Sequence, residues 1–257
     1  MSLFISSVFT YDEDAGNYIQ AVETADAQAL EPATRKAINN FVIGCKQDGI
    51  WTAIKASCIL AGARTRLGAL TPLVGTAPTP FGFVDANYNR KTGLKGATSN
   101  KYLNPARANN ADPQDSRHMC VFATEADSGT GAFFMGSDSL GSSGASGFFS
   151  LSGNVVYRLA GTAYITLNNA VRTGLLGASR SSSPLFYARQ NKTNTTAFGA
   201  AAAPTSSPYL VFARTGQAPS STIDARLAFY SIGESLDLAL LDARVTDLIN
   251  AFAVTIP

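Results

Sequence analysis

Closely spaced acidic residues are the first candidates for chemistry in this sequence, because a pair of carboxylates can act as acid and base in glycoside hydrolysis. The region after His118 has few acids, and in it Glu125 and Asp127 stand two positions apart. They follow an apolar run and come directly before Ser128-Gly129, a pair typical of a turn. We interpret both acids as residues of a solvated turn, with catalysis by this pair as the alternative.

His118 is the single histidine of the chain. A metal site with several histidines is therefore excluded, and Cys45, Cys58 and Cys120 lack the CxxC spacing of a zinc site. A Ser-His-Asp triad would need His118, but the sequence contains no GxSxG motif. We expect His118 to be a strand residue with a hydrogen-bonded ring, and we expect no catalytic residue, no metal and no cofactor.

Two further motifs have an ordinary explanation beside a functional one. The segment Gly93 to Gly96 matches the GxxG of a nucleic-acid-clamping loop, but that loop needs a helix on each side. We interpret it as a basic turn, which also accounts for Arg90, Lys91 and Lys95. In RANNADPQDSRH, the oxygens of Asn109, Asn110 and Asp112 suit calcium or a glycan, yet turn chemistry without a ligand explains them as well.

Aromatic side chains are candidates for stacking on sugars. We interpret Trp51 as a core residue of a helix, because it falls on an apolar stripe. Those of the later region alternate in apparent strands, so we interpret them mostly as core or interface residues: Phe133, Phe134, Phe148, Phe149, Tyr164, Tyr187 and Tyr209. The sequence alone does not assign the binding residues of the chain.

The composition of the chain favours a protein that works as part of an assembly. Charged residues make up 15% of the 257 residues, and the net charge is +2. An average soluble protein has about 25% charged residues, so like-charge repulsion between copies is weak here. We expect a homo-oligomer, and the small net charge gives no reason to expect a nucleic-acid partner.

The sequence also gives no reason to expect membrane insertion or export. No run approaches the roughly 20 apolar residues of a membrane span. The first residues lack a basic segment followed by a long apolar one, and the number of cysteines is odd. We therefore expect a protein made in a cytosol with reduced thiols.

Helical patterns fill the first part of the chain. Thr10 and Glu13 have the spacing of a capping box, and a second helix begins near Pro32 and stops at Gly49. A third helix is predicted from about Ile50 to Ala61. We interpret residues 1–75 as a helical docking or oligomerisation module.

Short strands separated by turn residues fill residues 76–257. The first is predicted at Phe81 to Val84, with a tight hairpin at Ser152-Gly153-Asn154. LAFYSI is apolar on both sides, which predicts a sheet covered on both faces. The later predicted strands are His118–Thr124, Ala132–Met135, Gly147–Ser152, Val155–Leu159, Ala163–Leu167, Gly174–Ala178, Leu185–Arg189, Thr196–Gly199, Tyr209–Arg214 and Ile223–Ile232. This density of strands predicts a β-sandwich or barrel.

A final helix is predicted from about Leu236 to Phe252, capped by Ser235. Its apolar residues form one stripe, while three charged residues, Asp242, Arg244 and Asp247, lie off the stripe. The members of the stripe are Leu236, Leu240, Leu241, Val245, Leu248, Ile249 and Phe252. The helix is expected to pack its stripe against the sandwich or the N-terminal module.

Four segments together resemble bacteriophage virion proteins of the tail-fibre or capsid-appendage type. They are DGIWTAIKASCILAGA (48–63), YNRKTGLKGATSNKYL (88–103), RANNADPQDSRH (107–118) and ARLAFYSIGESLDLALLDARVTDLINAF (225–252). Within that group the C-terminal part is similar to concanavalin-A-like, or laminin-G-like, jelly rolls. The resemblance implies a jelly-roll sandwich after a small helical module and before a C-terminal helix.

The same resemblance implies a non-enzymatic virion structural protein, part of a tail, another appendage or a capsid decoration. Its expected place is the virion, its expected partners are other virion proteins, and its lectin-like sandwich would serve host attachment. The alternatives are a carbohydrate-binding module that recognises a host surface glycan, and a glycan-cleaving tail enzyme. Fold alone does not choose among these functions.

Overall fold

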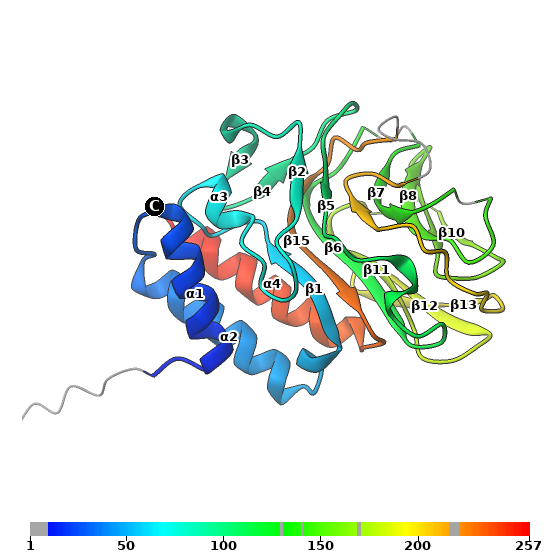
Figure 1. Ribbon diagram of the computed structural model, residues 1–257, viewed down its shortest axis with the longest axis horizontal. Helices are drawn as coiled ribbons and strands as arrows, with labels where there is room; N and C mark the ends of the chain where they lie inside the picture. The colour runs from blue at the N-terminus through cyan, green and yellow to red at the C-terminus, as the bar shows by residue number, and fades with distance from the viewer. Residues whose placement is uncertain (1–9, 129–130, 140, 169–170, 216–220) are drawn as a thin grey trace, which may run out of the picture.

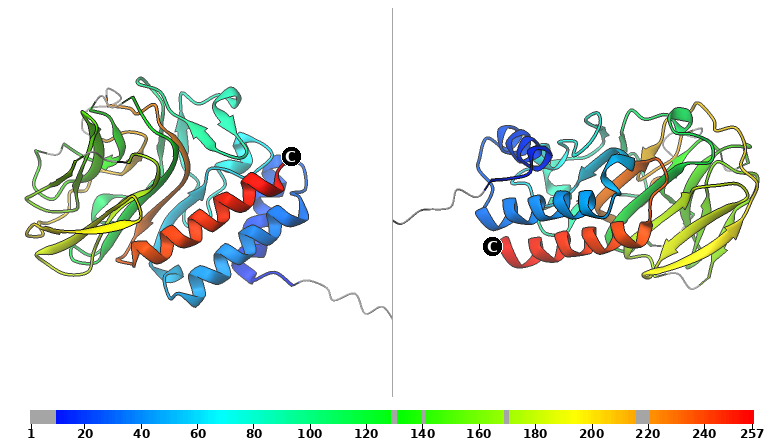
Figure 2. Two further views of the ribbon diagram at one scale, coloured as in Figure 1. Left: turned by 180° about the vertical axis from the view of Figure 1, so that it is seen from behind. Right: turned by 90° about the horizontal axis from the view of Figure 1, so that it is seen from below.

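Three layers build the molecule: a layer of helices and two antiparallel sheets, which we call sheet A and sheet B (Figure 1). The computed structural model describes residues 10–128, 131–139, 141–168, 171–215 and 221–257. The helices cover one face of sheet A, and the other face of sheet A packs on sheet B. Figure 2 shows α2 and α4 lying side by side across sheet A.

The first two helices form where the sequence predicts them. Helix α1 (Glu13–Asp26) begins after Asp12, whose carboxylate accepts a hydrogen bond from the Asp14 backbone N–H at 3.1 Å. The capping residue is therefore Asp12, and the predicted capping box at Thr10 is wrong. Helix α2 (Pro32–Gln47) has proline in its first turn, and Gly49 follows it with a positive φ of 71°, as predicted.

The predicted third helix is wrong. A short turn of helix, η1 (Trp51–Ala53), leads into strand β1 (Ile54–Ile59), which pairs antiparallel with β15 (Arg226–Gly233). Five of the six β1 residues are buried, so the apolar run carries no periodicity that separates helix from strand. Pairing with β15 decides the outcome. The strand predicted first, at Phe81 to Val84, is the second in the chain, and it runs over Thr79–Phe81 instead, so the predicted bounds are wrong.

Sheet A has, within the described residues, the strand order β13-β12-β11-β6-β15-β4-β3, with β1 also paired to β15. Sheet B has the order β10-β9-β8-β7-β14-β5-β2. The strands of sheet A not yet given are β3 (Tyr88–Asn89), β4 (Gly93–Lys95), β6 (Arg117–Glu125), β11 (Gly174–Arg180), β12 (Leu185–Gln190) and β13 (Thr193–Phe198). Those of sheet B are β2 (Thr79–Phe81), β5 (Tyr102–Asn104), β7 (Phe133–Ser137), β8 (Ser146–Leu151), β9 (Asn154–Arg158), β10 (Ile165–Leu167) and β14 (Leu210–Val211).

Each strand predicted after His118 has a counterpart, and the predicted fold class is confirmed: the chain is a jelly-roll β-sandwich with N-terminal helices and a C-terminal helix. Short helical segments complete it: α3 (Arg66–Ala69), η2 (Asp85–Asn87) and η3 (Asn109–Ala111). Among the described residues, none of the helices is both long and apolar enough to cross a lipid bilayer.

Strand β15 confirms the sheet covered on both faces. Leu227, Tyr230 and Ile232 belong to the core between the sheets, whereas Ala228 and Phe229 belong to the core under the helices. The predicted hairpin is confirmed as well, since β8 and β9 are joined by Ser152 and Gly153, with φ values of 50° and 82°.

Helix α4 (Leu238–Thr255) packs on sheet A beside α2, but its cap and stripe differ from the prediction. Asp237, not Ser235, caps it by accepting a hydrogen bond from Ala239 N–H at 2.7 Å. Leu240 is 37% exposed, whereas Asp242, placed off the stripe by the sequence, is buried. The reason is an ion pair across the interface, in which Arg189 Nη2 of β12 lies 2.7 Å from Asp242 Oδ2.

The segment around Arg90 joins the helices to sheet A. Gly93 to Lys95 form β4, so the predicted turn at Gly93 to Gly96 is wrong and the turn lies at 90–92. Arg90 Nη2 binds the Glu31 carboxylate at 2.9 Å, which accounts for this basic side chain without a ligand, as predicted. The division at residue 75 stays a prediction, and β1 from the first part pairs with β15 in the second.

Candidate functional site

The two closely spaced acids occupy different environments. Glu125, the last residue of β6, is exposed and accepts hydrogen bonds from Lys95 Nζ at 2.7 Å and Arg226 Nε at 2.6 Å. These hydrogen bonds, that from Lys95 first, hold the pKa of the Glu125 carboxyl below its ordinary value. Asp127 is buried and paired with Arg172 at 3.3 Å, so its prediction as a solvated residue is wrong. The two acids therefore have different cationic partners: Lys95 and Arg226 for Glu125, and Arg172 for Asp127.

His118 is a hydrogen-bonded strand residue, as predicted. Its ring is fully buried, with Nδ1 2.5 Å from the Glu234 carbonyl oxygen and Nε2 2.7 Å from Ser231 Oγ. Because a carbonyl only accepts, Nδ1 carries the proton, and the neutral Nε2 accepts from the serine hydroxyl. Burial lowers the pKa of His118 from 6.5 to about 4.

Acid is expected to destabilise the fold through His118. Above pH 6.5 the ring is neutral in both the folded and the unfolded chain, so its contribution does not change with pH. Between pH 6.5 and about 4 the unfolded chain binds the proton and the folded chain does not, so the unfolding free energy falls by about 3 kcal/mol. Urea titrations across this range measure the loss.

Two measurements separate the contribution of His118 from that of carboxylates that titrate in the same pH range. The chain has one histidine, so the NMR signal of its ring reports this pKa directly. His118→Gln removes the titration, and its unfolding free energy should fall less between pH 6.5 and 4 than that of the natural chain. A ring that titrates near its ordinary pKa of 6.5 in the folded protein would contradict the prediction.

The RANNADPQDSRH loop is held by buried polar groups. Asn109 Oδ1 accepts hydrogen bonds from Arg117 Nη1 at 3.0 Å, Ser146 Oγ at 2.8 Å and the Tyr209 hydroxyl at 2.8 Å. Asp112 pairs with Arg107. The oxygens of Asn109 and Asp112 are therefore used inside the protein, whereas Asn110 is exposed. No group of three or more His, Cys, Asp or Glu side chains with the geometry for a metal ion occurs among residues that the structure describes.

The aromatic residues divide into buried and exposed ones. Of the seven singled out in the sequence, Phe133, Phe134, Phe148 and Tyr209 are buried as predicted. Phe149 is half-buried and stacks on Phe133, with 4.9 Å between the ring centroids. Trp51 is half-buried and packs against the core under the helices, while its indole N–H donates to Asp14 Oδ2 at 3.1 Å, so the prediction of a core residue is confirmed only in part. Tyr164 and Tyr187 are 64% and 40% exposed, which makes them available to a ligand.

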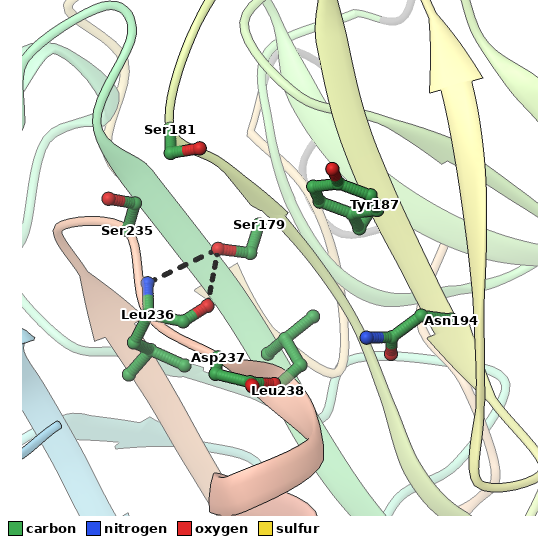
Figure 3. Close-up of a pocket in the computed structure, with 8 residues that line it drawn as sticks. All are labelled: Ser179, Ser181, Tyr187, Asn194, Ser235, Leu236, Asp237 and Leu238. Carbon is green, nitrogen blue, oxygen red and sulfur yellow. Dashed lines mark hydrogen bonds between the residues drawn. The ribbon is translucent and has the colours of Figure 1, made fainter. Parts of the chain in front are cut away.

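Tyr187 borders a pocket of about 360 Å³, which we call the Tyr187 pocket (Figure 3). It lies on the outer face of sheet A, where β11 to β13 emerge beyond the N-terminus of α4. In Figure 3, Tyr187 and Asn194 stand on one side of the pocket, with Ser179 and Leu236 opposite. The lining residues are Ser179, Ser181, Tyr187, Asn194, Ser235, Leu236, Asp237 and Leu238.

Strand register places these side chains on one face. Ser179 of β11 pairs with Tyr187 of β12, and Tyr187 pairs with Thr196 of β13. Successive residues of a strand point to opposite faces, so Phe186 and Ala188 enter the core while Tyr187 points outward. The alternation in LFYAR indicates that Tyr187 points away from Phe186 and Ala188. It does not indicate whether a helix covers the face on which Tyr187 lies.

The wall of the Tyr187 pocket is rigid. Ser179 Oγ donates to the Leu236 carbonyl at 2.8 Å and accepts from the Leu236 N–H at 3.2 Å, which fixes the segment before α4. Asn194 Oδ1 accepts from Arg189 Nη1 at 2.9 Å, and Arg189 is itself held by Asp242. The Asn194 amide nitrogen is thereby oriented for donation.

Several polar groups of the pocket are free to meet a ligand. Within the described part of the chain, the hydroxyls of Tyr187 and Ser181 and the Asn194 amide nitrogen make no hydrogen bond. Asp237 uses Oδ1 to cap α4, which leaves Oδ2 available. The pocket thus combines one exposed aromatic ring with donors and acceptors on both sides of it.

Comparison with known proteins leaves the family open. No family model matches the sequence, and no curated protein matches it. Among solved structures, the botulinum neurotoxin serotype D binding domain aligns with a TM-score of 0.49 at 10% identity, over 76% of this chain and 51% of that one. The chain spans about half the length of the first structures that it resembles.

Two other structures align with lower TM-scores. A Trypanosoma rangeli sialidase mutant displaying trans-sialidase activity has a TM-score of 0.47 and 8% identity, over 83% of this chain and 39% of that one. Domain 4 of AbnA, an arabinanase from Geobacillus stearothermophilus, has a TM-score of 0.39 and 11% identity, over 68% of this chain and 82% of that one. Scores of this size carry no argument about function.

Proposed function

We propose that this protein is a non-enzymatic carbohydrate-binding β-sandwich and that the Tyr187 pocket is its binding site. The observation that carries the proposal is the exposed Tyr187 ring beside unsatisfied hydroxyl, amide and carboxylate groups in one rigid pocket. A sugar ring has a face of C–H groups, which packs on an aromatic ring, and a rim of hydroxyls, which need donors and acceptors.

Binding without catalysis agrees with the state of the acids. Glu125 and Asp127 are held in separate ion pairs, and Glu125 has a lowered pKa, which makes it a poor proton donor. Among the described residues that line the Tyr187 pocket, Asp237 is the one carboxylate, and one of its oxygens caps α4. Hydrolysis by two carboxylates has no pair to use there.

Tyr187→Ala is expected to lower the affinity for a bound glycan by about tenfold or more, because it removes the stacking surface. A glycan array first identifies ligands of the natural protein, and calorimetry then measures both proteins. Tyr187→Phe keeps the ring and should retain most of the affinity. Tyr164→Ala removes a still more exposed aromatic ring elsewhere and should change nothing. An array without signal above background would refute the proposal.

We further propose that the sandwich works as a surface component of a bacteriophage virion. Support comes from the resemblance carried by residues 48–63, 88–103, 107–118 and 225–252, and from the 15% of charged residues, which favours an assembled state. Other virion proteins and further copies of the chain are the partners in this proposal, and host attachment through a surface glycan is its purpose.

Electron microscopy tests the virion proposal. Antibodies raised against the protein should label purified phage particles at a defined place, and mass spectrometry of those particles should detect the chain. The isolated protein should form oligomers as its concentration rises. Particles without the chain, together with a protein that stays monomeric, would refute this part and leave the glycan proposal standing.

A further inference from the structure

Phe198 is a second exposed aromatic residue on the face that carries Tyr187. It is the last residue of β13, pairs with Leu185 of β12 and is 76% exposed. Two positions separate Leu185 from Tyr187, and two separate Phe198 from Thr196, the partner of Tyr187. Because side chains alternate along a strand, all four point to the outer face of sheet A.

Three rows of cross-strand pairs follow one another on this face. Arg189 and Asn194 come first, beside α4, then Tyr187 and Thr196, then Leu185 and Phe198. Residues two positions apart in a strand are about 6.8 Å apart, so the outer rows are separated by about 14 Å. A ligand that contacts both Asn194 and Phe198 is therefore longer than a single sugar ring.

The charges of this face limit the kind of sugar. Arg189 is buried and its charge is matched by Asp242, so it offers no free cation. Asp237 contributes a negative charge at the end of the Tyr187 pocket. No lysine or further arginine lines that pocket among the described residues. An acidic sugar would meet a carboxylate without a compensating cation, whereas a neutral sugar would not.

An exposed phenylalanine on an edge strand also needs a reason. Strand β13 ends sheet A, and within it the described residues Thr193 to Phe198 carry no charge. Edge strands are commonly protected by charged residues or proline, because exposed apolar side chains there promote association. At this edge, threonine hydroxyls and an asparagine stand beside the aromatic ring, a mixture that suits a hydroxyl-rich ligand with an apolar face.

We infer that the binding face runs along the β12–β13 hairpin from Asn194 to Phe198 and takes a neutral oligosaccharide of at least two sugar residues. Tyr187 and Phe198 each stack on one sugar ring, while Asn194, Thr196 and Asp237 bind hydroxyls. This inference rests on the proposed function, because the Tyr187 pocket forms its first subsite. It adds a second subsite, a minimum ligand length and a preference for uncharged sugars.

The second subsite is tested by measuring how affinity changes with the length of the oligosaccharide. An array of neutral, sialylated and uronic-acid oligosaccharides, each from one to six residues, is probed with the natural protein and three variants. We expect neutral chains of two or more residues to bind at least about tenfold more tightly than the matching monosaccharide. Phe198→Ala should remove that advantage and leave monosaccharide binding unchanged, whereas Tyr187→Ala should weaken both. Phe198→Tyr should retain the preference for length.

The outcomes separate this inference from the proposed function. Absence of any binding overturns both. Equal affinity for one and several residues, or full binding by Phe198→Ala, overturns the second subsite, and tighter binding of acidic than neutral chains overturns the preference for uncharged sugars. Each of these results leaves the proposed function standing. Sedimentation of the same variants excludes another cause: a natural dimer that becomes monomeric in Phe198→Ala with unchanged glycan binding would assign Phe198 to contact between copies, and would also overturn the inference. Thermal melting confirms that each variant is folded.

Discussion

Replacing Leu241 with aspartate is expected to unfold the protein at room temperature. Leu241 is fully buried in the seam between α4 and sheet A, within the core under the helices. The substitution removes a large apolar side chain and places a carboxylate among the buried apolar residues of this core. The combined cost is about 5 kcal/mol or more, comparable with the whole stability of a typical domain.

Leu240 provides the matched control for this experiment. It precedes Leu241 on the same helix but is 37% exposed, so Leu240→Asp should change the unfolding free energy by less than about 1 kcal/mol. Urea titration and circular dichroism measure both variants. A soluble Leu241→Asp with native stability would mean that α4 does not pack on sheet A through this residue.

Removing the Arg189 guanidinium is expected to cost about 3–5 kcal/mol, because it leaves the buried carboxylate of Asp242 without its partner. Arg189 Nε and Nη2 lie 2.9 Å and 2.7 Å from Asp242 Oδ2, and both side chains are buried. Arg189→Met keeps most of the side-chain volume, so the loss reports the charge and its hydrogen bonds. Chemical denaturation of the single variant measures it.

A second substitution tests the explanation. In Arg189→Met with Asp242→Leu neither charge remains, so much of the stability should return. Glycan affinity should stay reduced in the double variant, because Arg189 Nη1 also orients Asn194 in the Tyr187 pocket. A double variant as unstable as the single one would show that packing, and not the unpaired charge, causes the loss.

Short-range patterns predicted much of the fold. Ser152-Gly153 allows a tight hairpin because both residues adopt positive φ, and this is decided within four residues of chain. LAFYSI predicted a sheet covered on both faces, since apolar side chains on both sides of a strand need two apolar partners. His118 was predicted as a hydrogen-bonded strand residue because its strand pattern is equally local.

The errors occur where distant residues decide the outcome. The run from Ile54 to Ile59 suits a helix or a strand, and pairing with β15 makes it a strand. Asp242 was placed off the apolar stripe because it is charged, and Arg189 of β12 allows its burial. Asp127 was expected in a solvated turn, but Arg172 pairs with it inside the protein.

By itself the sequence determined the fold class, most strands and the helix at each end, because apolar periodicity and turn residues act over a few positions. The binding face was decided only by the tertiary structure. The alternation in LFYAR turns Tyr187 away from the core between the sheets, and its ring is exposed because α4 begins beside it and covers Arg189 instead. The reason is physical: whether an outward-facing side chain is covered depends on where another element ends, which no local pattern records.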